Sequence, residues 1–222
     1  MKEQYFSDEN LAQVTQSLLQ SACDKSHQRN LFLKPEKSAL IVLDMQNYFL
    51  EPSSHAFIPS APAIIGNIQK LVEIFISKSR PVIFTRHVNS GEDAGMMKKW
   101  WKDLLLISDP ASEIIPQLIE YDADVIVKTQ YDAFYNTELE EMLRNNGVEH
   151  IVICGVMTHL CCESTARSAF VRGFMVHFPL DGTATYNREF HLSTIRNLSH
   201  GFASILTVQD VMNQMVRDAE DN

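Results

Sequence analysis

Three residues of the sequence carry side chains that could combine in nucleophilic catalysis, and each follows a predicted strand. Asp44 ends the apolar run ALIVLD, Lys128 ends DVIVK, and Cys161 follows HIVICG at a predicted helix start. Ligands of open parallel sheets bind beyond the carboxyl ends of the strands. A base, a cation and a thiol at that edge would suit covalent catalysis. Taken singly, each has an ordinary alternative: a turn-capping Asp, a solvated Lys and an inert buried Cys.

The two adjacent cysteines are expected to differ in environment. Thr158 is the expected N-cap, which places Cys161 in the first helical turn, where free N–H groups and the helix dipole lower the pKa of a thiol. Cys162 shares a helical stripe with the small residues Ala166 and Ala169, which suit close packing on a sheet. We therefore expect a reactive thiolate at Cys161 and a core position for Cys162.

The elements that must position these residues alternate along the chain. Six short apolar runs predict strands buried on both faces of a sheet, at 39–44, 81–86, 124–128, 150–155, 174–179 and 203–208. Amphipathic segments predict helices at 62–79, 112–120, 136–146, 159–172 and 188–202. The expected fold class is α/β: a three-layer αβα, doubly wound, Rossmann-like domain with a mainly parallel six-stranded sheet.

The amino-acid composition limits the kinds of protein that this chain could be. The chain has 222 residues, 45% of them hydrophobic, so we expect one domain over 1–222, in which residues 1–30 form a helical extension with a helix near 8–21. The formal net charge of −9, without a basic cluster, argues against a nucleic-acid partner. Neither a signal peptide nor a membrane span is expected, so the protein is predicted to be cytoplasmic with reduced thiols.

The long segment 86–111 contains both tryptophans and no clear strand. Because it follows the carboxyl end of a predicted strand, it is a candidate lid or binding loop. An oligomer contact or a packed surface helix is the alternative.

Four stretches resemble the isochorismatase-like cysteine hydrolase superfamily, which includes nicotinamidases, N-carbamoylsarcosine amidohydrolases and isochorismatases. They lie within about residues 36–210 and read LIVLDMQNYF, VIVKTQYDAFYNTELEEML, GVMTHLCCESTARSAFVRGF and DGTATYNREFHLSTIRNLSHGFA. The resemblance implies that Asp44, Lys128 and Cys161 are a catalytic triad. It also implies a cis peptide at Val156–Met157, and an oxyanion hole made by the backbone N–H groups of Met157 and Cys161.

Two departures from the family patterns narrow the expected chemistry. Nicotinamidases usually carry an Asp-x-His metal motif, whereas here Thr85 stands two residues before His87, so neither a metal nor another cofactor is expected. True isochorismatases often have glycine where Cys161 stands, and they cleave a vinyl ether with an acid. The retained thiol favours covalent cleavage of a C–N bond in a small amide or carbamoyl compound. A vinyl-ether hydrolase and a non-catalytic ligand-binding protein are the alternatives.

Several side chains near the predicted strand ends could contact a small apolar or planar substrate. The candidates are Phe49, Arg86, His87, Trp100, Tyr131 and Phe134. Arg86 could bind a substrate carboxylate, although a structural salt bridge is equally compatible with its position. Each aromatic residue could instead belong to the core. The expected partners are a small-molecule substrate and further copies of the chain, in a homo-oligomer that is a dimer or a tetramer.

Overall fold

The computed structural model describes residues 1–22, 31–101 and 103–217. Residues 23–30 of the predicted N-terminal extension lie outside the described residues. Within the described part of the chain, seven strands form one parallel sheet in the order β3-β2-β1-β4-β5-β7, with β6 paired to β4. The strands are β1 (Ser38–Leu43), β2 (Val82–His87), β3 (Asp124–Lys128), β4 (His150–Val156), β5 (Met175–Pro179), β6 (Thr183–Ala184) and β7 (Ser204–Leu206).

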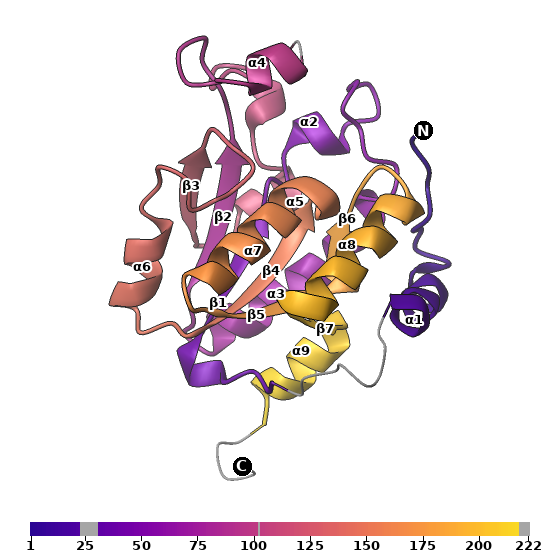
Figure 1. The fold of residues 1–222 in the computed structure, drawn as a ribbon, viewed down its shortest axis with the longest axis vertical. Coiled ribbons are helices and arrows are strands. Elements are labelled where there is room, and N and C mark those ends of the chain that lie inside the picture. The colour runs from indigo at the N-terminus through magenta and orange to yellow at the C-terminus, as the bar shows by residue number, and fades with distance from the viewer. Residues whose placement is uncertain (23–30, 102, 218–222) are drawn as a thin grey trace.

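Helices cover both faces of the sheet, as a doubly wound fold requires (Figure 1). They are α1 (Leu11–Ala22), α2 (Asn47–Leu50), α3 (Ile65–Ser77), α4 (Met97–Trp100), α5 (Pro116–Ile119), α6 (Leu139–Asn145), α7 (Glu163–Val171), α8 (Arg188–Gly201) and α9 (Val208–Met215). Helices α7 and α8 lie in front of the sheet in Figure 1, and α3 lies behind it. Helix α1 packs against α8. The three-layer αβα prediction is confirmed.

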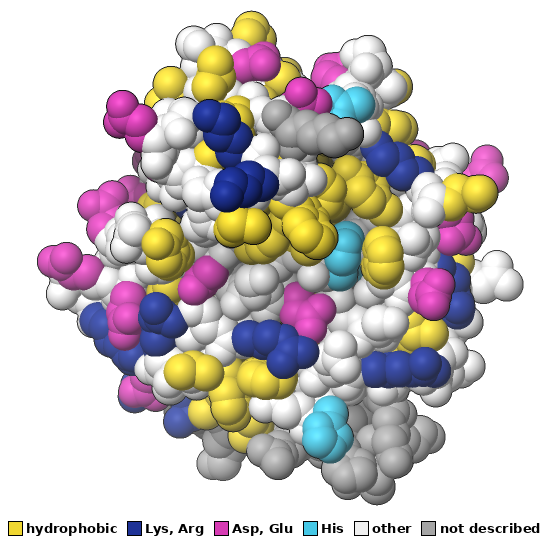
Figure 2. All heavy atoms as spheres, turned by 45° about the horizontal axis from the view of Figure 1, so that its top comes forward, with side chains coloured by type: hydrophobic (Ala, Val, Ile, Leu, Met, Phe, Trp, Pro, Cys, Tyr) yellow, Lys and Arg dark blue, Asp and Glu magenta, His cyan; other side chains and the backbone are white. Residues whose placement is uncertain are grey.

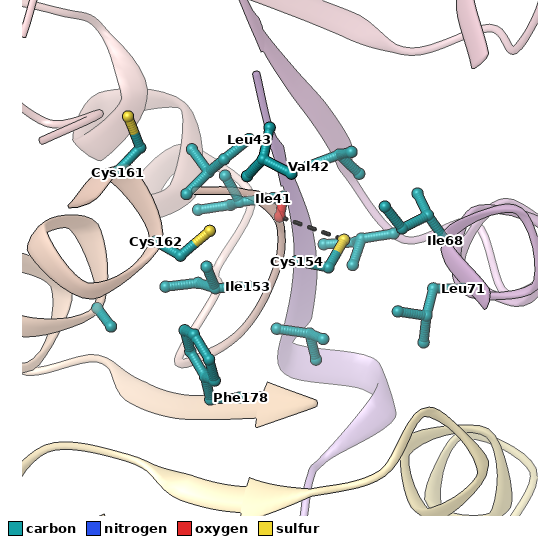
Figure 3. Close-up of a cluster of buried hydrophobic side chains, with 14 of the residues drawn as sticks. Ile41, Val42, Leu43, Ile68, Leu71, Ile153, Cys154, Cys161, Cys162 and Phe178 are labelled. Carbon is teal, nitrogen blue, oxygen red and sulfur yellow. Dashed lines mark hydrogen bonds between the residues drawn. The ribbon is translucent and has the colours of Figure 1, made fainter. Parts of the chain in front are cut away.

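The central strands β1 and β4 are buried along their whole length, which explains why their sequences are continuous apolar runs. They run side by side, with Leu40 beside Val152 and Leu43 beside Gly155. Side chains from both strands pack with those of α3, including Ile68 and Leu71, in the core drawn in Figure 3. Gly155 has no room for a side chain, because a Cβ atom there would lie 2.1 Å from the carbonyl oxygen of Leu43.

The sequence analysis predicted six strands, one fewer than the described part of the chain contains. The missing strand, β6, is only two residues long and pairs with the end of β4. A run of two residues is too short for its periodicity to show in the sequence.

Two helices also differ from what the sequence analysis predicted. The segment 112–120 contains only the short α5, because Pro116 forces Ile115 into an extended conformation (φ −58°, ψ 146°) and so stops a longer helix. Helix α9 was not predicted. It begins after Thr207, whose side chain forms a capping box with Asp210.

In the described segments no helix combines the length and the apolar character that crossing a membrane requires.

Candidate active site

Asp44, Lys128 and Cys161 converge beyond the carboxyl ends of β1, β3 and β4. The Lys128 Nζ atom lies 2.8 Å from Asp44 Oδ2 and donates a hydrogen bond to Cys161 Sγ over 3.5 Å. It also donates to the carbonyl oxygen of Gln130 at 2.9 Å. The side chains of Asp44 and Lys128 are fully buried, and Cys161 is 6% exposed. The spatial expectation from the sequence is therefore met: a carboxylate, an ammonium group and a thiol lie in direct contact.

Asp44 is held in place by the neighbouring strand. It comes directly after β1 and has a left-handed backbone (φ 52°). The Thr85 hydroxyl of β2 donates to Asp44 Oδ1 at 2.6 Å. The other oxygen, Oδ2, faces Lys128 in the ion pair, and the Asp44 side chain is close enough to Cys161 to raise the pKa of its thiol.

Cys161 lies in a π-helical turn, Thr158–Cys162, that leads into α7. We call it the Cys161 turn. Its N-cap is Met157, which has an extended backbone and no capping side chain, so the expectation that Thr158 is the N-cap is wrong. The turn begins one residue earlier than expected, which places Thr158 inside it. The Cys161 sulfur points away from the labelled core side chains in Figure 3, whereas that of Cys162 points toward them.

The burial of Cys161 opposes the thiolate that the sequence analysis expected. Burial raises the pKa of the Cys161 thiol to about 12, although the nearby Lys128 charge acts in the opposite direction. Burial alone would lower the pKa of Lys128, but its interactions with Asp44 and Cys161 outweigh burial and hold that pKa above its ordinary value. Burial therefore favours a neutral thiol beside the ion pair of Lys128 and Asp44.

The peptide bond between Val156 and Met157 is cis, as the resemblance implied. It joins the end of β4 to the Cys161 turn.

Two of the candidate substrate-binding residues lie beside the cluster. Burial, followed by the Lys128 charge, lowers the pKa of His87 to about 4, so this imidazole is neutral at pH 7. Tyr131 is close enough to Cys161 and Lys128 for both to shift its pKa, although burial is the main cause of the upward shift. The Tyr131 hydroxyl accepts a hydrogen bond from Trp101 Nε1 at 2.5 Å.

The other four candidates make structural contacts, are buried or are exposed to solvent. Arg86 makes the structural interactions that were its alternative: its guanidinium pairs with Glu113 at 2.7 Å and donates to the carbonyl oxygens of Ile107 and Ser112. Phe134 is buried and stacks on Phe174, and Phe49 is buried in the core. Trp100 is 73% exposed.

Helix α4, part of the segment that follows β2, lies beyond the carboxyl ends of β2 and β3 in Figure 1. Asn89 fixes the start of this segment, since its N–H donates to Leu105 O and its side chain donates to Thr129 O. The exposed hydrophobic residues of the segment are Met96, Trp100, Trp101, Leu106 and Ile107. Figure 2 turns this side of the molecule forward and shows hydrophobic side chains gathered over the upper half of the view.

The residues present do not fit a metal site of the kind that nicotinamidases carry. Thr85 replaces the expected carboxylate, and its hydroxyl is already bonded to Asp44. Among the residues that the structure describes, no group of three or more His, Cys, Asp or Glu side chains could hold a metal ion.

Sequence reasoning missed the positioning role of Thr85 and the Gln130 carbonyl. Only Thr85 leaves a signal, since it is the first polar residue after the apolar residues 82–84 of β2. A backbone carbonyl has no sequence signature, so the contact from Lys128 to Gln130 could not be predicted.

Comparisons with known proteins agree with this fold. The family model described as the Isochorismatase domain matches residues 38–210. The chain is 40% identical to nicotinamidase 3 of Arabidopsis thaliana, over 76% of this chain and 84% of that protein. It is 28% identical to the isochorismatase of Bacillus subtilis, over 82% of this chain and 59% of that protein. The crystal structure of a cysteine hydrolase from Pseudomonas syringae superposes with a TM-score of 0.79 at 28% identity, covering 82% of this chain and 94% of that one. The chain therefore belongs to the isochorismatase family of hydrolases.

Proposed function

We propose that this protein is a cysteine hydrolase that cleaves the C–N bond of a small, uncharged amide or carbamoyl compound through a thioester on Cys161. The observation that carries the proposal is the contact of Lys128 Nζ with both Asp44 Oδ2 and Cys161 Sγ. The 40% identity to a protein named nicotinamidase 3 supports amide chemistry.

In the proposed reaction, Asp44 accepts the thiol proton as the Cys161 sulfur attacks the carbonyl carbon. The raised pKa of the thiol makes such a base necessary, because little thiolate exists at neutral pH. The N–H groups of Met157 and Cys161 would hold the oxyanion, and Lys128 would balance the charges. Asp44 then gives the proton to the departing nitrogen and removes one from the water that hydrolyses the thioester.

An uncharged substrate suits the charges around the cluster. Lys128 is neutralised by Asp44, Arg86 is paired with Glu113, and His87 is neutral at pH 7. None of these three groups offers an unpaired positive charge to a substrate carboxylate.

Hydrolysis of a vinyl ether is the second candidate function, because the chain is 28% identical to the Bacillus subtilis isochorismatase. In that reaction Asp44 would act as an acid, and the thiol would not be needed. The two candidates therefore differ in their dependence on Cys161.

The test is ammonia release from a panel of small amides, ureas and carbamoyl compounds by the wild type, Cys161→Ala and Cys162→Ala. We expect the wild type and Cys162→Ala to release ammonia and Cys161→Ala to lose it by at least about 10³-fold. Intact mass with a slow substrate should show an acyl adduct on Cys161. Full activity of Cys161→Ala would reject the thioester route, and turnover of a vinyl ether alone would favour the second candidate. The cytoplasmic location, the single domain and the dimer or tetramer stay predictions from the sequence.

A further inference from the structure

Residues 1–6 precede the matched family domain of 38–210, yet they pack against residues that support the Cys161 turn. We call these six residues the strap. Its backbone is tied to the loop before α8: the N–H of Glu3 donates to Tyr186 O at 2.7 Å, and the N–H of Arg188 donates to Glu3 Oε2 at 3.2 Å. Asn187 Nδ2 donates to Met1 O. In Figure 1 the strap begins at the label N and lies beside this loop.

Tyr5 is the strap residue that reaches the interior. Its side chain is buried, and the backbone N–H groups of Tyr5 and Phe6 donate to Ser60 Oγ at 2.9 and 3.1 Å, which fixes the backbone. The Tyr5 hydroxyl accepts a hydrogen bond from the N–H of Thr185 at 3.0 Å and shares another with His191 Nδ1 at 2.8 Å. Burial raises the pKa of this hydroxyl well above its ordinary value, so the group is neutral.

Thr185 connects Tyr5 to the Cys161 turn. While its N–H is bonded to Tyr5, its Oγ1 is bonded to His159 Nδ1 at 2.5 Å. His159 belongs to the Cys161 turn and lies two residues before Cys161. Its ring is stacked on Phe190 of α8, with centroids 4.4 Å apart and planes 19° apart. Hydrogen bonds therefore run without interruption from the strap to the turn that carries the sulfur.

Two further residues of the Cys161 turn also lie near Tyr5. Thr158 and Cys162 both influence the pKa of the Tyr5 hydroxyl, after burial, which is the largest cause. The first and last residues of the Cys161 turn therefore lie close to this hydroxyl as well.

We propose that Tyr5 is a positioning residue for Cys161: through Thr185 and His159, its hydroxyl holds the Cys161 turn so that the sulfur stays beside Lys128. This inference rests on the proposed role of Cys161 as the nucleophile. A sulfur that moves away from Lys128 loses the charge that lowers its pKa, so it forms thiolate less readily.

The test compares Tyr5→Phe with Tyr121→Phe. Phenylalanine at position 5 keeps the ring that packs against Phe6 and His191 and removes only the hydroxyl. The control loses a hydroxyl that donates to Glu73 at 2.9 Å on the protein surface. For each variant we would measure kcat and KM for a hydrolysed amide. We would also measure the rate of iodoacetamide alkylation at Cys161, by peptide mass mapping from about pH 7 to 10.

For Tyr5→Phe we expect kcat to fall about fivefold with KM unchanged. A fall of about this size corresponds to the net free energy of one hydrogen bond. Alkylation of Cys161 should slow by about the same factor, and its pH profile should move to higher pH. Tyr121→Phe should match the wild type in all three measurements. Wild-type kcat and alkylation in Tyr5→Phe, whatever its thermal stability, would overturn the proposal and leave the strap a purely structural element.

If Tyr5→Phe does not fold, Thr185→Val tests the same connection. This variant keeps the backbone N–H that donates to Tyr5 but loses the hydroxyl bonded to His159. We expect the same fall in kcat and the same slower alkylation, and wild-type values would overturn the proposal. Iodoacetamide alkylates a thiol directly, so this measurement does not depend on whether the protein binds or hydrolyses an amide. If the wild type hydrolyses no amide, the proposed function fails, while the alkylation rates still decide whether Tyr5 positions Cys161.

Discussion

Thr85 holds Asp44 at two points. The N–H of Asp44 donates to Thr85 Oγ1 at 3.1 Å, and the same hydroxyl donates to Asp44 Oδ1 at 2.6 Å. Both residues are fully buried. A single hydroxyl from β2 thereby fixes both the backbone and the carboxylate of the residue that follows β1, and it leaves Oδ2 directed to Lys128.

Replacement of Thr85 by valine should show how much this contact contributes to stability and to kcat. Valine has nearly the same shape, but it leaves the buried N–H and Oδ1 of Asp44 without their partner. We expect the free energy of unfolding to fall by about 1–3 kcal/mol and kcat to fall about tenfold. Urea unfolding and ammonia-release kinetics measure the two effects. Thr85→Ser keeps the hydroxyl and serves as the control; equal kcat values for the valine variant and the wild type would contradict the assigned role.

Lys128→Met should damage both stability and activity. The substitution leaves the buried Asp44 carboxylate without its cation, which destabilises proteins by about 3–5 kcal/mol. It also removes the charge that lowers the pKa of Cys161, so we expect kcat to fall by about 10²–10³. Lys37→Met is the matched control, because it removes an ion pair to Glu149 in which both side chains are about half exposed. A Lys128→Met enzyme as active as the control would remove Lys128 from the proposed mechanism.

The raised pKa of Cys161 predicts how its reactivity depends on pH. A group with a pKa of about 12 is almost entirely protonated at neutral pH, and its thiolate fraction grows about tenfold with each pH unit. The rate of iodoacetamide alkylation at Cys161 in the free enzyme should therefore rise with this slope from about pH 7 to 9. A plateau below about pH 8 would instead indicate the thiolate that the sequence analysis expected.

The buried pair His150 and His177 predicts a loss of stability in acid. Their rings share a hydrogen bond of 3.0 Å, and burial, together with His150, lowers the pKa of His177 to about 3 from an ordinary value of 6.5. The unfolded chain binds this proton more readily than the folded protein does. The stabilisation is therefore fully present above pH 6.5 and is lost as the pH falls toward about 3.

Urea unfolding at several pH values tests this prediction. Each such histidine should lower the free energy of unfolding by about 1.4 kcal/mol per pH unit within that window. His87 and His191 act in the same direction, since burial lowers the pKa of each, to about 4 and about 3. His177→Asn should reduce the slope, because it removes the buried group whose pKa is lowered. An unaltered slope in His177→Asn would contradict the assignment.

The strands were predictable because a parallel sheet covered on both faces needs unbroken apolar runs, and each of the six runs overlaps an observed strand. Helix ends were less predictable, as Ile115 and Pro116 show, because local steric rules outweighed the apolar pattern. For the site, the sequence was sufficient to select Asp44, Lys128 and Cys161, since residues that end parallel strands share one edge of the sheet.

The sequence by itself determined the fold class and which three side chains meet, because hydrophobic runs and strand order depend on residue types along the chain. Only the tertiary structure decided the state of Cys161: burial of the sulfur outweighs the helix position that favours a thiolate. It also decided that Arg86 pairs with Glu113 and that Tyr5 reaches the Cys161 turn. Desolvation and contacts between distant segments depend on how the whole chain packs, so no local pattern of residues records them.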